Sequence, residues 1–264
     1  MPDDGPVRIG AGIFALHDPH RGHERAFNRF YERDHMYGAA ILAPWTIAGQ
    51  RFVATKDLKE MRYPREGPFG PVEDGSYLTM YWIADDHLAT QQAWASEQMK
   101  LLAEAGRTFE QRSVPTATTY DYLGSWERDE DGVPPFLALD RRYDGAVWVV
   151  LEHTGDSTVP ADLANWLAGE FLPARFADSP VAMGVMFTPR AKEPWWPAAA
   201  PDVPGVGERV FVAFFLETDV RAAFDQWFAK LGDDLAATGE CRALLVAPFI
   251  PSIPGTDAYI DQLW

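Results

Sequence analysis

Short apolar runs alternate with amphipathic stretches along the chain, in an order that occurs twice. In the first half the hydrophobic pattern predicts strands over 9–17, 46–55, 77–84 and 116–126, and helices over 24–42 and 85–105, with a long loop over 56–75. In the second half it predicts strands over 146–153, 181–189, 209–216 and 242–250, and helices over 161–176 and 220–238. Each half therefore follows the βαββαβ order of the ferredoxin-like unit.

Individual residues indicate that the two halves are copies of one unit. The aligned pairs at an offset of 136 residues are His17/His153, Phe30/Trp166 and Pro44/Pro180, and those at 133 are Trp94/Trp227 and Gly106/Gly239. The change of offset predicts a short deletion in a loop, where repeats tolerate it.

A single ferredoxin-like sheet carries helices on one face, so its other face needs a cover. Two units in one chain can cover each other. We therefore expect an α+β fold in which tandem ferredoxin-like units pack two antiparallel sheets into one pseudo-two-fold α/β barrel. The predicted domain boundaries are 1–128 for the first unit, 129–145 for an acidic linker, and 146–264 for the second unit with its tail.

The first predicted helix and the strand after it contain a distinctive residue pattern. The segment 27–35 holds an aromatic pair, an acidic stretch and His35, and it is followed by Pro44-Trp45 and Arg51-Phe52. This pattern resembles the EthD-like branch of the dimeric α/β-barrel superfamily. The resemblance implies small, often aromatic or polyketide-like substrates held between sheet and helices, commonly without an organic cofactor. Monooxygenases, cyclases and isomerases belong to that family, and its fold alone does not choose among them.

The second half departs from this pattern at the polar positions. At the offset of 136, Tyr31 corresponds to Leu167 and His35 to Phe171, while Trp45 corresponds to Val181. Loss of a histidine to phenylalanine is typical of a copy that kept the fold and lost a site. We therefore expect the site in the first half, with the second half as a wall.

His35 is the leading catalytic candidate, as a general acid or base, because imidazole titrates near neutrality. Tyr31 lies one helical turn earlier on the same face and is predicted to share a substrate oxygen with it. Asp34 points about 100° away on a helix, so a direct Asp–His pair is not expected. The alternative for His35 is a partly buried structural histidine.

Trp45, Arg51, Tyr81 and His17 are the predicted substrate-binding residues. An arginine such as Arg51 could hold a carboxylate or enolate oxygen. The alternative for the arginines at 51, 62 and 65 is ordinary surface charge, and most of the tryptophans are expected to fill the core.

Two other histidine patterns have competing interpretations. His17, His20 and His23 lie in one turn, but their spacing matches no common metal site, so a solvated turn is favoured and no metal is predicted. His153 is the second half's one histidine. It leaves open a haem-binding tandem barrel, because chlorite dismutase-like proteins and dye-decolourising peroxidases use a histidine in that half.

Composition narrows the classes of partner. The chain has 264 residues and a net charge of −16, with no basic stripe, which argues against nucleic acid and anionic membrane surfaces. A single cysteine, Cys241, and the absence of a signal-like or membrane-spanning stretch favour a cytoplasmic protein. The predicted function is a cofactor-independent small-molecule enzyme, acting as a monomer with an internal pseudo-dimer or as a homodimer. The alternative is a barrel that binds a hydrophobic small molecule without catalysis.

Overall fold

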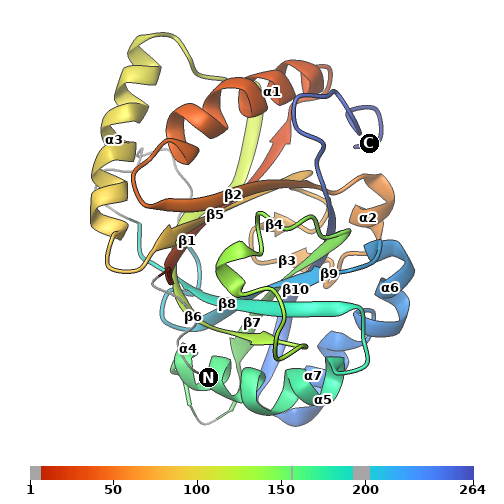
Figure 1. Ribbon diagram of the computed structural model, residues 1–264. Coiled ribbons are helices and arrows are strands. Elements are labelled where there is room, and N and C mark those ends of the chain that lie inside the picture. Colours follow the sequence, from red (N-terminus) through yellow and green to blue (C-terminus); the bar gives the residue numbers. More distant parts are fainter. Residues whose placement is uncertain (1–6, 156, 193–202) are drawn as a thin grey trace.

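The centre of the molecule is a closed barrel of eight antiparallel strands, in the order β1-β5-β2-β10-β7-β9-β8-β6 (Figure 1). The computed structural model describes residues 7–155, 157–192 and 203–264, so the predicted loop tryptophans Trp195 and Trp196 lie outside the described residues. The first half contributes β1 (Ile9–Pro19), β2 (Thr46–Val53), β5 (Tyr77–Ala84) and β6 (Arg112–Glu127). The second half contributes β7 (Gly145–His153), β8 (Val181–Pro189), β9 (Arg209–Leu216) and β10 (Cys241–Pro251).

The two halves have the same strand order and meet at both edges. The first half runs β6-β1-β5-β2 and the second runs β10-β7-β9-β8, with β6 paired to β8 and β10 paired to β2. The predicted α+β fold of two tandem ferredoxin-like units in one barrel is therefore confirmed. The sheets do more than face each other, because hydrogen bonds join them edge to edge.

Each half carries its helices on the outer face of its own sheet, above the barrel for the first half and below it for the second (Figure 1). The first-half helices are α1 (Glu24–Phe30), the π-helical η1 (Tyr31–His35) and η2 (Tyr37–Ile41), and α3 (Leu88–Glu104). The second-half helices are α4 (Pro160–Trp166), the π-helical η4 (Leu167–Phe171), α5 (Leu172–Phe176), α6 (Val220–Trp227) and α7 (Leu231–Thr238).

A π-helical turn interrupts the first helix of both halves at matching positions. The segments η1 (Tyr31–His35) and η4 (Leu167–Phe171) are 136 residues apart (31 to 167), which is the offset predicted from the sequence. A π turn inserts one residue into the helical repeat and often marks a functional site. The correspondence of His35 with Phe171 therefore agrees with the backbone as well as the sequence.

Three connections differ from the sequence prediction. The loop over 56–75 contains α2 (Lys56–Glu60) and a small hairpin of β3 (Glu66–Gly67) and β4 (Gly70–Pro71). The helix predicted over 85–105 begins three residues later, at Leu88, with His87 at the N-cap and no side-chain capping bond. The linker contains the 3₁₀ turn η3 (Pro135–Leu137) and packs against the barrel, with Leu139 and Tyr143 buried.

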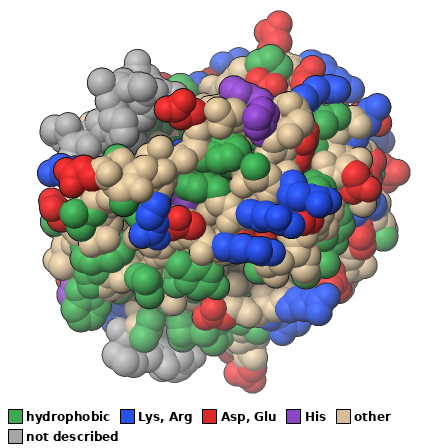
Figure 2. Space-filling view, turned by 90° about the horizontal axis from the view of Figure 1, so that it is seen from above, with side chains coloured by type: hydrophobic (Ala, Val, Ile, Leu, Met, Phe, Trp, Pro, Cys, Tyr) green, Lys and Arg blue, Asp and Glu red, His purple; other side chains and the backbone are tan. Residues whose placement is uncertain are grey.

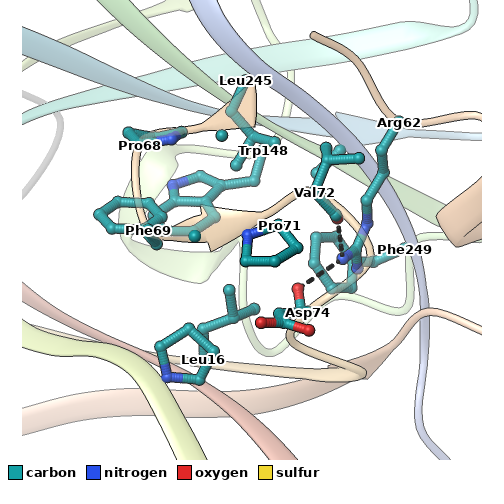
Figure 3. A pocket seen from close by; sticks show the side chains of 14 residues that line it. Leu16, Arg62, Pro68, Phe69, Pro71, Val72, Asp74, Trp148, Leu245 and Phe249 are labelled. Carbon is teal, nitrogen blue, oxygen red and sulfur yellow. Dashed lines mark hydrogen bonds between the residues drawn. The ribbon is translucent and has the colours of Figure 1, made fainter. Parts of the chain in front are cut away.

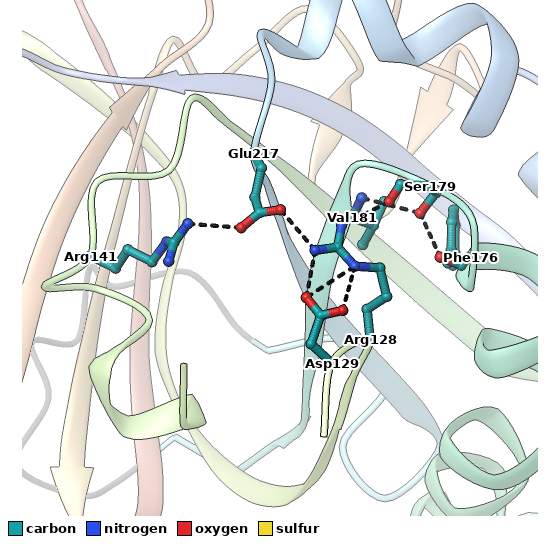
Figure 4. A network of polar contacts seen from close by, with 7 residues as sticks. All are labelled: Arg128, Asp129, Arg141, Phe176, Ser179, Val181 and Glu217. Atoms are coloured by element: carbon teal, nitrogen blue, oxygen red, sulfur yellow. Dashed lines mark hydrogen bonds and ion pairs between the residues drawn. The ribbon is translucent and has the colours of Figure 1, made fainter. Parts of the chain in front are cut away.

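An arginine–carboxylate network attaches the linker to the second sheet (Figure 4). Glu217 accepts from Arg128 at 2.8 Å and from Arg141 at 2.7 Å, and Arg128 also donates to the Ser179 carbonyl at 2.9 Å. These bonds join the start and middle of the linker to the end of β9, so the two halves are held together along the linker as well as through the barrel.

Aromatic side chains fill the barrel interior. Phe14 stacks on Trp148 at 5.9 Å between ring centroids, and Trp82 stacks on Phe187 at 5.0 Å. Phe69, from the β3–β4 hairpin, stacks on the other side of Trp148 at 5.5 Å (Figure 3). The space left beside the hairpin has a volume of about 10 Å³, roughly one water molecule. The interior beside the hairpin is therefore closely packed.

Arg62 fixes the segment that follows the hairpin. Its buried guanidinium donates to the carbonyl oxygens of Val72 at 3.1 Å, Asp74 at 2.9 Å and Gly75 at 2.9 Å (Figure 3). The interpretation of this arginine as surface charge is wrong, since all three bonds are to backbone inside the protein.

The last part of the chain, residues 252–264 (the tail), crosses from the second half onto α1 of the first. Asp257 pairs with Arg29 at 3.0 Å, Leu263 is fully buried, and Trp264 lies under Lys59 at 4.3 Å. Figure 2 views this side from above and shows a group of Lys and Arg side chains on it. Within the described residues, no helix has both the length and the apolar character needed to cross a membrane.

We expect Phe187→Ala to lower the free energy of unfolding by about 3–5 kcal/mol, because it leaves a cavity where aromatic rings of both halves meet. Phe187 is fully buried against Phe14 and Trp82. Urea denaturation followed by tryptophan fluorescence and by circular dichroism should show one transition shifted equally in both signals. The exposed Leu42→Ala is the control, with a change within about 0.5 kcal/mol. Separate transitions for the two signals would show that the halves unfold independently.

Candidate active site

The outer face of the first-half sheet carries polar side chains toward its helices. Cross-strand pairing places Arg51 next to Thr79, and Thr79 next to Ala15. The adjacent row on the same face sets Tyr81 between Gly49 and Ile13. Neighbours two residues apart along a strand share a face, so these rows form one continuous surface beneath α1, η1 and α3.

Matching bulges show which residues of the two sheets correspond. β2 has a register shift between Thr46 and Ala48, and β8 has one between Val181 and Met183. Aligning these shifts makes Gly49 equivalent to Gly184. Both glycines make room for an aromatic ring: a Cβ on Gly49 would lie 2.5 Å from the Tyr81 side chain, and one on Gly184 would lie 2.9 Å from the Phe214 side chain.

The same register corrects two sequence alignments. Matching the shifts of β2 and β8 makes Val181 equivalent to Thr46, so the expected equivalence of Trp45 and Val181 is wrong. Ile13 pairs with Tyr81 and Val147 pairs with Phe214, so the offset between β1 and β7 is 134 residues (13 to 147). His17 is therefore equivalent to Leu151. The expected equivalence of His17 and His153 is wrong, because it counted residues at a constant offset across the first loop. His17 thereby joins the residues that are polar only in the first half.

The space between each sheet and its helices thus differs at seven equivalent positions, which are polar in the first half and apolar in the second. We call these spaces the first-half layer and the second-half layer. The polar residues of the first-half layer are His17, Tyr31, His35, Arg51, Thr79, Tyr81 and Thr119, and their equivalents in the second half are Leu151, Leu167, Phe171, Met186, Val212, Phe214 and Pro248.

Several polar atoms of the first-half layer are buried without a hydrogen-bond partner among the described residues. They are His17 Nδ1, Arg51 Nε and Nη2, Thr79 Oγ1, Thr119 Oγ1, and, on α3, Gln91 Oε1 and Gln92 Nε2. Leaving one buried polar atom unpaired costs about 1–3 kcal/mol. Such a concentration in one layer is typical of a site whose partners are supplied by a ligand or by water.

His35 lies at the end of η1, partly exposed at the rim of this layer. Its ring is 5.3 Å from that of Tyr31 and 5.2 Å from that of Phe30. Burial, and then the nearby Arg112 guanidinium, lowers the pKa of His35 to about 4. The imidazole is therefore neutral at pH 7 and has a nitrogen free to accept a proton. Asp34 does not orient it, since its carboxylate accepts from Arg107 Nε at 3.0 Å.

Tyr31 is buried between the two histidines of the layer. Its ring lies 5.2 Å from that of His17, in an edge-on arrangement. Burial, and then Arg112, holds the pKa of His17 well below its usual range. Burial and the adjacent Tyr31 raise the pKa of Tyr81 well above its usual range. At neutral pH the layer therefore presents two neutral imidazoles and the protonated phenol of Tyr81, which donate and accept hydrogen bonds without carrying charge.

Arg51 is the fixed charge beneath this group. Only 2% of its surface is exposed, so its interpretation as surface charge is wrong. Its Nη1 donates to Asn28 Oδ1 at 2.7 Å and Glu32 Oε1 at 2.8 Å, and its guanidinium lies 3.7 Å from the centre of the Tyr77 ring. Glu32 in turn accepts from the backbone N–H of Gly255 in the tail at 2.7 Å. Arg51 is thus held rigidly from three sides.

The structure brings together His17, Tyr31, His35, Arg51 and Tyr81, and it places Trp45 elsewhere. Trp45 is 51% exposed and stacks on His87 at 3.5 Å, in a shallow surface depression.

The polar residues that sequence reasoning did not single out are Thr79, Thr119, Gln91, Gln92 and Arg112. Two adjacent glutamines within a helix, and the run of threonines over 116–119, were the available signals.

The histidines of the first turn do not gather into a metal site. His20 and His23 are exposed, and His20 comes no closer than 3.5 Å to Ser113 Oγ. Across residues 7–155, 157–192 and 203–264, no group of three or more His, Cys, Asp or Glu side chains is arranged to hold a metal ion.

The second-half layer does not fit haem. Apolar side chains fill it, among them Leu163, Phe176 and Phe228, each almost fully buried. His153 lies at the end of β7 with its Nε2 donating to the Val159 carbonyl at 3.0 Å, so its ring already has a partner. No step is therefore assigned to haem in this half.

Comparisons with known proteins agree on the fold. No protein-family model and no curated protein sequence matches the chain. Among solved structures, an anthrone oxidase-like protein is 11% identical, with a TM-score of 0.52 over 96% of this chain and 98% of its own. A chlorite dismutase-like protein is 11% identical, with a TM-score of 0.53 over 97% of this chain and 100% of its own.

A peroxidase shares this architecture as well. A dye-decolorizing peroxidase from Bacteroides thetaiotaomicron is 10% identical, with a TM-score of 0.51 over 100% of this chain and 99% of its own. The fold is therefore that of the ferredoxin-like dimeric α/β barrels, and at these identities the likeness extends to the fold alone.

Acidification should destabilise the protein through its buried histidines. Unfolded histidine titrates near 6.5, whereas the folded pKa of His35 is about 4 and that of His17 is also lowered. Between these values the unfolded chain binds more protons, so the free energy of unfolding falls as the pH drops from about 6.5 toward 4, by up to about 1.4 kcal/mol per pH unit for each histidine. Urea denaturation of His17→Leu from pH 7 to pH 5 should show a shallower fall than wild type. Equal slopes would mean that His17 is not held neutral in the folded state.

The two layers should respond in opposite ways to exchange of their residues. We expect Leu151→His to lower the free energy of unfolding at pH 7 by about 2 kcal/mol or more, because it buries an imidazole among apolar side chains. His17→Leu, its matched control at the equivalent position, should leave stability unchanged or higher. Thermal denaturation of both variants checks this, and similar losses in the two would contradict the register equivalence.

Proposed function

We propose that the protein is a small-molecule enzyme, resembling the EthD-like α/β-barrel proteins, that transfers protons in the first-half layer of residues 1–128. The observation that carries the proposal is the contrast at seven equivalent positions, which are polar in the first half and apolar in the second, and four of the seven polar residues carry buried atoms without a partner. Polar residues that cost stability and occur in only one of two copies are typical of a functional site.

His35 acts as the general base in this proposal. Its neutral ring, beside Tyr31 at the rim of the layer, can take a proton from an activated C–H or O–H group. Tyr81 stays protonated because its pKa is raised, and Tyr31 and Tyr81 donate hydrogen bonds to the oxygen on which negative charge develops. Arg51, fixed by Glu32 and Asn28, adds a positive potential beneath them that favours an enolate or phenolate. His17 is a further hydrogen-bonding contact.

The substrate is a flat hydrophobic molecule, such as an aromatic or polyketide-like compound. Aromatic rings line the approach, with Phe30 stacked on Phe109 at 5.5 Å. Removal of a proton from such a compound begins isomerisation, cyclisation and oxygenation alike. In oxygenation without a cofactor, the carbanion itself reduces dioxygen: an anthrone CH₂ becomes C=O, one oxygen atom enters the product, and the other leaves as water with the two hydrogens.

His35→Phe tests the proposal, because it installs the residue that the second half has at the equivalent position. With anthrone in air as the probe, anthraquinone formation should fall by at least about 100-fold relative to wild type, the size of a general-base contribution. His153→Phe, the matched control in the second half, should retain wild-type turnover. Unchanged turnover in His35→Phe contradicts the assignment. Binding of anthrone without turnover above its spontaneous oxidation would identify a binding protein instead.

A further inference from the structure

Arg112, the first residue of β6, brings a second positive charge to the rim of the first-half layer. Its guanidinium lies 5.7 Å from the centre of the Phe30 ring, on which His35 also stacks. Its Nη1 is buried and has no hydrogen-bond partner. Among the described residues its side chain forms no ion pair, although the chain carries a net charge of −16 and most of its buried arginine charge is paired or bonded to backbone.

The two carboxylates of η1 are already engaged. Asp34 accepts from Arg107, and Glu32 accepts from Arg51 and from the Gly255 N–H. His17 and His35, which both face Arg112, are neutral and supply no counter-charge. A guanidinium taken partly out of water without a negative partner is unfavourable unless a ligand supplies one.

We propose that Arg112 binds a carboxylate group of the ligand, so that the site selects aromatic acids over their neutral analogues. This inference rests on the site of the proposed function, and it adds the charge of the substrate and the residue that recognises it. A carboxylate fits the planar guanidinium through two parallel N–H···O bonds. The ring attached to it would lie along Phe30 and Phe109, which are stacked beside Arg112.

Binding of an anion would also change the neighbouring histidine. The positive charge of Arg112 lowers the pKa of His35, after burial itself. A bound carboxylate offsets that charge, so the proton affinity of His35 rises when the ligand is present. The site would thus gain basicity on binding the correct substrate, which links selection of the acid to proton transfer.

The test uses two probes of the same shape, 2-naphthoate and 2-naphthamide, titrated into the protein by isothermal calorimetry. Wild type should bind naphthoate at least about 10-fold more tightly than naphthamide, because hydrogen bonds to a charged partner are the stronger ones. Arg112→Gln should weaken naphthoate binding by about 10- to 100-fold and leave naphthamide binding unchanged. Arg112→Lys keeps the charge but loses the two parallel N–H donors, so its affinity for naphthoate should lie between those of wild type and Arg112→Gln.

Arg142→Gln, at an exposed arginine of the linker, is the matched control and should bind both probes as wild type does. Equal affinity of wild type for the two probes overturns the inference, as does an undiminished preference in Arg112→Gln or a failure of wild type to bind naphthoate at millimolar concentration. Near-wild-type melting of Arg112→Gln and Arg112→Lys shows that the variants are folded.

The two proposals fail separately in this experiment. If Arg112→Gln loses the preference for naphthoate but His35→Phe keeps full turnover, the anion site stands and the proposed catalysis does not. If His35→Phe is inactive while wild type shows no preference between the probes, the proposed catalysis stands and the anion site does not.

Discussion

Closure of the barrel is the constraint on which the rest of the structure depends. Two four-stranded sheets expose four edges, and pairing of β6 with β8 and of β2 with β10 removes all of them. Closure also fixes the interior volume, which the chain fills with rings from both halves and with Phe69 of the hairpin. The interior beside the hairpin is packed, and the unpaired polar groups of the first-half layer lie outside the barrel wall, between the sheet and its helices.

Of the two layers outside the wall, the second-half layer contributes mainly to stability, and the first-half layer carries the residues proposed for chemistry. The second-half layer is ordinary core, in which residues such as Met186 and Val212 gain from burial. The first-half layer gives up that gain at the equivalent positions, Arg51 and Thr79. A chain with one copy would have to support the same unpaired polar groups with half the core. Duplication lets one half stabilise a fold whose other half carries groups that destabilise it.

Much of the fold could be predicted from the sequence, because strand periodicity and turn residues act locally. The strands over 77–84, 181–189 and 209–216 begin and end where the pattern placed them. The His35/Phe171 contrast was also visible, since neither of the two helices has an insertion relative to the other and one offset aligns them throughout. The equivalence of His17 was not, because insertions in the first loop change the offset and only strand pairing reveals the register.

Burial was harder to predict than position. Arg51 and Arg62 are charged and lie beside a loop rich in Pro and Gly, which favours exposure, yet both are enclosed by segments distant in sequence. Trp45 shows the opposite error: a large apolar residue after a helix is normally packed, and here it lies on the surface. Such outcomes depend on tertiary contacts that no local pattern contains.

The tail makes the order of synthesis matter for the site. Glu32 reaches its backbone partner 223 residues later in the chain, at Gly255, beyond the strand that closes the barrel. Until β10 and the tail have been synthesised, Glu32 lacks this partner, and the carboxylate that holds Arg51 is itself incompletely held. The strand that closes the barrel is therefore synthesised before the tail that completes the contacts of Glu32, so the site is completed last.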